Sequence, residues 1–163
     1  MSQSRPFIVL ALAFWIAAAL QQAAAPHLAI AGARPDFLLV VALAASVMFP
    51  PVVAAVLGFA SGLLHGGVAG SDVASLTVIR TLGAYLAGYV SRLELDVRPW
   101  YVGLVAFGGT LLASLLKMVP SPPPETWPYL RDTIFAAMYN GVLAIPLYAL
   151  LRRTLHHKVN SRP

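Results

Sequence analysis

Residues 37–71 read FLLVVALAASVMFPPVVAAVLGFASGLLHGGVAGS, and these 35 residues contain no aspartate, glutamate, lysine or arginine. A helix needs about 20 apolar residues to cross the roughly 30 Å of hydrocarbon in a bilayer. Pro50-Pro51 divides the run, because the first proline cannot continue a helix and restricts the residue before it. The stretch therefore predicts two membrane-embedded helices in succession, at 36–49 and 52–68.

The sequence on either side of this stretch is of the same kind. Of the 163 residues, 59% are hydrophobic and 10% are charged, and the mean hydropathy is +0.77. Soluble domains carry about 25% charged residues, because a folded surface must be hydrated. We therefore expect lipid to cover most of this protein. Further charge-free runs cover 6–33, 99–116 and 133–151.

The predicted fold is all-α: a compact bundle of about six transmembrane helices that forms one integral membrane domain over residues 1–163. Asp36 is expected at a helix N-terminus, where the helix dipole favours a negative charge. The connector Pro120–Pro124 is expected to be extended. The six helices are expected at residues 7–25, 36–49, 52–68, 74–90, 99–119 and 132–151.

The positions of the basic residues predict the orientation. With the N-terminus inside, the seven inner residues are Arg5, Arg92, Arg98, Arg152, Arg153, Lys158 and Arg162, and the three outer ones are Arg34, Lys117 and Arg131. The positive-inside rule then places both termini in the cytoplasm. This predicts a multi-pass protein of a bacterial cytoplasmic membrane.

The net charge of +5 does not indicate nucleic-acid binding, because the basic residues are scattered between the spans. The cluster after residue 151 is better explained by topology and anionic lipid. The chain has no cysteine, which excludes disulfides and thiol chemistry. Its histidines are not spaced as metal ligands, so neither a metal nor a cofactor is expected.

Small residues recur at every fourth position of the third expected helix. This spacing forms a flat strip that lets another backbone approach closely. We expect the strip to hold the helix within its own bundle, and a contact with another protein is the alternative. A looser version, Ala13 and Ala17, lies on the first helix and could meet a partner. The strip comprises Ala54, Gly58, Gly62, Gly66 and Gly70.

Ser61 and His65 are four residues apart and could hydrogen-bond on one helix face. They invite a comparison with serine hydrolases, but no nearby acidic residue orients the histidine in sequence, and the nucleophile spacing is missing. A polar pair inside a bundle is the favoured interpretation, and no enzymatic activity is expected.

Arg80 and Asn140 also fall within expected spans. A charge in hydrocarbon is a functional-site hypothesis by default. Arg80, however, lies only about 9 Å from the expected helix start, so its side chain could reach the outer surface or Asp72. We expect Asn140 to hydrogen-bond a neighbouring helix.

Several segments together resemble the rod shape-determining protein MreD family. The resemblance covers nearly the whole chain. The length of the chain and its expected number of spans also fit the family. It differs at His65, where the family commonly has an acidic residue, and at Ser71-Asp72, where the family has a glycine-containing turn. The matching segments are Arg34-Pro35-Asp36, Gly58–Leu64, Ala84-Tyr85-Leu86, Asn140-Gly141-Val142-Leu143, Pro146 and Leu151-Arg152-Arg153.

The resemblance implies a non-enzymatic membrane subunit of the bacterial cell-elongation complex. Such a subunit would bind MreC and help to organise peptidoglycan synthesis and rod shape. RodA, a class B transpeptidase and MreB would be further members of the complex.

The alternative is a substrate-binding subunit of an energy-coupling vitamin transporter, which is also a small helical bundle and which MreD proteins resemble in architecture. Such a subunit needs an outward pocket with polar and aromatic groups. Its candidates here are His65, Arg80, Tyr139 and Asn140.

Overall fold

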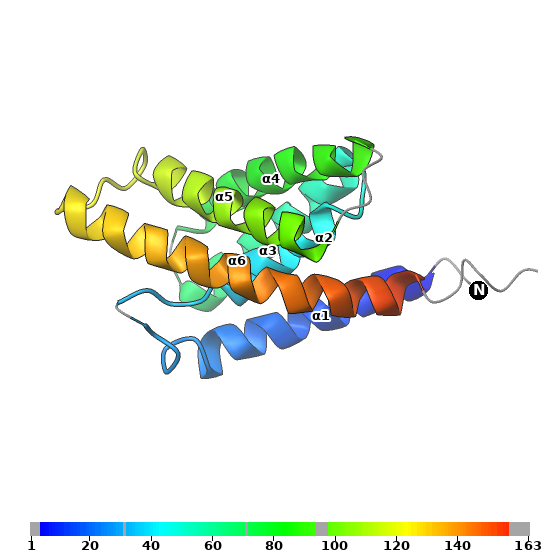
Figure 1. Ribbon diagram of the computed structural model, residues 1–163. Helices are drawn as coiled ribbons and strands as arrows, with labels where there is room; N and C mark the ends of the chain where they lie inside the picture. The colour runs from blue at the N-terminus through cyan, green and yellow to red at the C-terminus, as the bar shows by residue number, and fades with distance from the viewer. Residues whose placement is uncertain (1–3, 31, 71, 94–97, 157–163) are drawn as a thin grey trace, which may run out of the picture.

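The computed structural model describes residues 4–30, 32–70, 72–93 and 98–156, and this part of the chain is helical, without a strand. Figure 1 shows the helices side by side along a common direction, with the start of α1 and the end of α6 at the same end of the bundle. The elements are α1 (Ser4–Ala23), α2 (Phe37–Ser46), α3 (Pro51–Ala69), α4 (Val73–Gly88), the short 3₁₀ helix η1 (Tyr89–Leu93), α5 (Pro99–Lys117) and α6 (Thr126–His156).

Three of the expected features lie wholly or partly outside the described residues. They are Ser71 of the Ser71-Asp72 pair, residues 94–97 between the helices expected at 74–90 and 99–119, and the tail 157–163 with Lys158 and Arg162.

The expectation of about six membrane-spanning helices needs a correction. Within the described residues, five helices, α1 and α3 to α6, are long and apolar enough to cross a membrane, which makes the chain a multi-pass membrane protein. α2 has 10 residues, or about 15 Å, which is half the hydrocarbon thickness. It is shorter than the expected 36–49 because Val47–Phe49 form a turn before Pro50.

α2 lies at the centre of the bundle and contacts each of the other five α-helices. Every residue from Leu38 to Ser46 is buried. α2 therefore has protein neighbours on all sides, whereas the other helices pack around it and keep part of their surface exposed on the outside of the bundle.

α3 and α4 form the most extensive helix pair, and glycine is the reason. A Cβ on Gly58 would lie 2.3 Å from the Arg80 carbonyl oxygen, and a Cβ on Gly62 would lie 2.3 Å from the Cα of Thr77. Side chains would push these backbones apart. Close approach of this kind replaces the hydrophobic driving force that lipid does not supply.

α5 and α6 form an antiparallel pair in which Gly103 and Gly141 face each other: a Cβ on Gly141 would lie 2.9 Å from the Gly103 carbonyl oxygen. α6 is longer than the expected 132–151, because it begins at Thr126, soon after the proline-rich connector, and continues past Leu151 to His156. The end of the bundle at which α5 ends and α6 begins is called the Lys117 end below.

Candidate functional site

Asp36 stands at the head of α2 and joins three elements. Its side chain caps the helix by accepting a 2.9 Å hydrogen bond from the Leu39 N–H. The other carboxylate oxygen pairs with the guanidinium of Arg80 in α4. Its own backbone N–H donates to Oδ1 of Asn140 in α6, at 2.9 Å. Asp36 therefore fixes where α2 begins relative to both helices.

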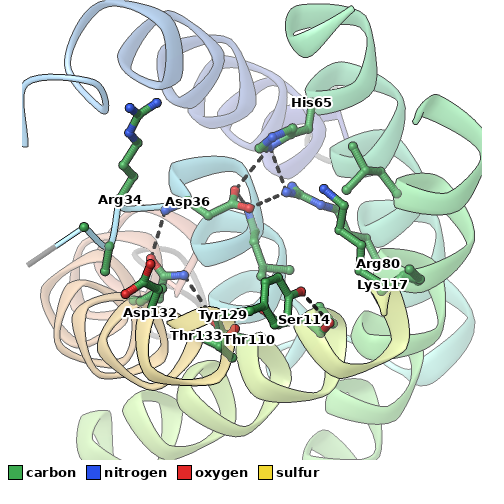
Figure 2. Close-up of a pocket in the computed structure, with 18 residues that line it drawn as sticks. Arg34, Asp36, His65, Arg80, Thr110, Ser114, Lys117, Tyr129, Asp132 and Thr133 are labelled. Carbon is green, nitrogen blue, oxygen red and sulfur yellow. Dashed lines mark hydrogen bonds and ion pairs between the residues drawn. The ribbon is translucent and has the colours of Figure 1, made fainter. Parts of the chain in front are cut away.

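Arg80 does not reach for the membrane surface or for Asp72, as its position near the helix start suggested. Its side chain is 3% exposed and turns inward, where it pairs with Asp36, donates to the Ser61 hydroxyl at 2.9 Å and contacts Nδ1 of His65 at 2.7 Å. Figure 2 shows the side chains of Arg80 and His65 both directed at the Asp36 carboxylate. The expectation was wrong because the carboxylate that neutralises Arg80 comes from a segment 44 residues earlier.

His65 joins this group through its ring nitrogen Nδ1. That nitrogen lies 2.7 Å from the Arg80 guanidinium and 3.5 Å from the Asp36 carboxylate. The imidazole therefore connects α3 to the Asp36–Arg80 pair.

Asn140 links α2, α5 and α6, and its partners fix the orientation of its amide. The Asp36 backbone N–H is a donor, so the amide atom that faces it is the oxygen. The amide nitrogen then donates to the Thr110 hydroxyl at 3.2 Å, and Thr110 donates to the Ala106 carbonyl at 2.8 Å. The expected helix-to-helix bond of Asn140 is thus present.

Gln21 attaches the end of α1 to the same region. Its side-chain oxygen accepts a 2.8 Å bond from the Phe37 N–H, and its nitrogen donates to the Pro35 carbonyl at 3.3 Å. One amide therefore satisfies two backbone groups beside the start of α2.

Ser61 is fully buried and its hydroxyl is already in use. It donates to the Leu38 carbonyl at 2.9 Å and accepts from Arg80. Although Asp36 brings a carboxylate close to His65, the hydroxyl proton goes to a backbone carbonyl and not to the imidazole. The arrangement fastens α3 to α2 and does not activate a nucleophile.

A pocket of about 500 Å³ lies directly against this network, at the Lys117 end. Its floor comprises Asp36, His65, Arg80, Thr110 and Asn140. Apolar walls come from α4, α5 and α6, and charged side chains lie toward the helix ends. The pocket volume is within the range of small-molecule sites. Figure 2 shows the charged side chains nearest the helix ends, which are Arg34, Lys117 and Asp132.

The remaining candidate residues lie on α3, α1 and α6. Ala54, Gly58, Gly62 and Gly66 face α4, whereas a Cβ on Gly70 would meet no atom within 4 Å, and Gly70 ends α3 with a φ of 67°. Ala17 is 3% exposed and, with Ala13 beside it, belongs to the core around α2. Tyr139 is not part of the pocket lining, because adjacent helix residues point about 100° apart. In the described part of the chain, no three acidic or histidine side chains gather as a metal site.

Sequence reasoning missed Asp36 as the partner of Arg80, and also Thr110 and Gln21. One signal was present. A helix from 36 to 49 would measure about 21 Å, too short to cross 30 Å of hydrocarbon. Such a helix must have at least one end inside the bilayer, and a charged first residue there needs a partner of opposite charge.

Comparison with known proteins adds no identification: no family model, curated protein or solved structure matches the chain.

Proposed function

We propose that this protein is a non-enzymatic subunit of the bacterial cell-elongation complex in the inner membrane, with both termini cytoplasmic and MreC as its principal partner. RodA, a class B transpeptidase and MreB would be further members of that complex. The proposal starts from the resemblance to the MreD family.

One observation supports the proposal above all: three of the six segments that carry the resemblance meet in one place. Asp36 comes from the Arg34-Pro35-Asp36 segment, Ser61 from Gly58–Leu64, and Asn140 from Asn140–Leu143. They are joined through Arg80, to which both Asp36 and Ser61 bond, and through the Asp36–Asn140 bond. Residues 104 positions apart along the chain thus act as one unit.

The arrangement suits a scaffold. Buried charges are expensive in a membrane and are retained where they fix geometry or serve a function. Here Asp36 and Arg80 hold α2, α3 and α4 together, and the neutral side chain of Asn140 joins α6 to the Asp36 backbone. The outer helices leave large apolar side chains facing outward. A locked bundle can hold a partner's transmembrane helix at a defined position, and its short loops leave that contact to the helix faces.

The experiment is affinity purification of the tagged protein from its own membranes in mild detergent, followed by mass spectrometry. Recovery of MreC, RodA or a class B transpeptidase is the expected result. A matched variant, Arg80→Leu, should lose these partners if the locked bundle is what they recognise. Recovery of wild-type protein without any cell-elongation component would contradict the proposal.

A second candidate, a substrate-binding subunit of an energy-coupling vitamin transporter, is favoured by the pocket, whose floor contains three of the four residues expected for it: His65, Arg80 and Asn140. In this reading the six-helix arrangement would correspond to the architecture of such subunits. Recovery of a coupling protein with ATPases in the same purification would support this candidate and displace the first.

A further inference from the structure

We propose that the pocket at the Lys117 end binds a singly charged phosphodiester, presented either by a lipid headgroup or by a soluble molecule. The inference concerns the pocket's own chemistry, and it holds whether the protein is a scaffold or a transport subunit.

The first argument is the charge of the lining. Among the lining side chains with a full formal charge, Arg34, Arg80 and Lys117 are cationic, and Asp36 and Asp132 are anionic. Three positive groups against two negative ones leave a net charge of +1. One negative charge on a ligand would balance it.

The second argument is the supply of hydrogen-bond donors. Ser61, Asp36 and His65 use three of the five N–H groups of Arg80. Its Nε–H has no partner, and no fully buried side-chain nitrogen or oxygen in the described ranges lacks one. The Nε–H is therefore accessible, in a side chain that lines the pocket. Asn140 keeps a second amide N–H after its bond to Thr110.

The carboxylate at the pocket floor, in contrast, is already engaged. Asp36 accepts from Leu39 through Oδ1 and pairs with Arg80 through Oδ2, and one oxygen of Asp132, nearer the helix ends, accepts from Arg131. A floor with free donors and an occupied carboxylate favours a ligand that is rich in acceptor oxygens.

The third argument is position. Arg80 lies seven residues inside α4 and Thr110 seven residues before the end of α5, so the floor is about 10 Å below the helix ends. Lys117, the last residue of α5, is half-exposed and only loosely paired with Asp72, at 3.9 Å. The pocket thus runs from the level of the helix ends, where lipid phosphates lie, into the bundle. A phosphodiester is the singly charged oxyanion available there.

The test measures the thermal midpoint of the purified full-length protein in an uncharged detergent, with three probes. These are phosphatidylglycerol, its deacylated headgroup glycerophosphoglycerol, and phosphatidylcholine as the overall neutral control. Native mass spectrometry of the same samples counts the bound molecules. We expect stabilisation and a retained adduct with phosphatidylglycerol but not with phosphatidylcholine. The same response to glycerophosphoglycerol would also support the site and would identify a soluble ligand.

Two variants tie the response to the pocket. Lys117→Gln removes a half-exposed cation and is expected to weaken binding about tenfold. Ala136→Phe, in the α6 wall, fills the space and should abolish binding without changing any charge. Arg92→Gln, which removes a cation at the opposite end of the bundle, is the matched control and should bind like wild type. No response to phosphatidylglycerol or to glycerophosphoglycerol, or a response that survives both pocket variants, would overturn the proposal.

Discussion

α1 and α2 are both apolar along their length, yet they occupy opposite environments. In α1 only 17% of the spanning window is buried, and Phe7, Trp15 and Ile16 face outward. In α2 every residue from Leu38 to Ser46 is buried. Lipid tails and protein interiors are equally apolar, so hydropathy does not separate the two cases. The two helices differ in length, since α2 is the shorter, and α2 has polar residues at its start.

The largest effect is expected where α2 is anchored. Arg80→Leu leaves Asp36 as an uncompensated charge at the head of α2, which should cost about 3–5 kcal/mol in the free energy of unfolding. Unfolding in mixed detergent micelles measures it. Arg34→Leu, an exposed neighbour, is the control and should change stability by less than about 0.5 kcal/mol. Equal effects of the two substitutions would mean that Arg80 is not a buried anchor.

The next effect concerns the helix pair beside α2. Gly62→Ala places a Cβ 2.3 Å from Thr77 and should separate α3 from α4, at a cost of about 3 kcal/mol. Gly67 has nothing within 4 Å of an added Cβ, so Gly67→Ala should be neutral or stabilise α3 by up to about 1 kcal/mol through helix propensity. Thermal midpoints in one detergent compare the two. A Gly62→Ala protein as stable as Gly67→Ala would remove the close-approach explanation.

A direct comparison of α1 and α2 uses the same substitution in each. Ala44 in α2 is 0% exposed, so Ala44→Leu overfills the centre and should cost about 2 kcal/mol. Ala19 in α1 is exposed, and Ala19→Leu should change the unfolding free energy by less than about 0.5 kcal/mol. If Ala19→Leu were more destabilising than Ala44→Leu, the placement of α2 at the centre of the bundle and α1 at its periphery would be wrong.

The smallest effect is expected at the link between the two helices. Gln21→Ala removes the bonds to Phe37 and Pro35 and should cost about 1–2 kcal/mol. Gln22→Ala, at the adjacent exposed position, is the control. Proteolysis at the α1–α2 connection should rise in the first variant alone, and identical cleavage in both would contradict the tether.

Much of this fold was predictable, because membrane helices can be recognised in a sequence by their length and apolar content. The break at Pro50-Pro51 and the N-terminal position of Asp36 follow from backbone chemistry. The burial of the Arg80 side chain and its pairing with Asp36 could not be predicted in this way. Nothing local to Arg80 points to a carboxylate 44 residues away, and position in the helix favoured the nearer surface. The pocket could not be predicted from the sequence either, since it forms where five segments meet.

The account rests on the claim that Asp36 and Arg80 form one buried pair that anchors α2. A double-mutant cycle with Asp36→Asn, which keeps the helix cap, and Arg80→Leu tests it directly. Each single variant leaves one unpaired charge, whereas the double variant leaves none. The account predicts that the double variant is more stable than the sum of the two losses implies, by at least about 1.5 kcal/mol. Losses that add to within about 0.5 kcal/mol would contradict it.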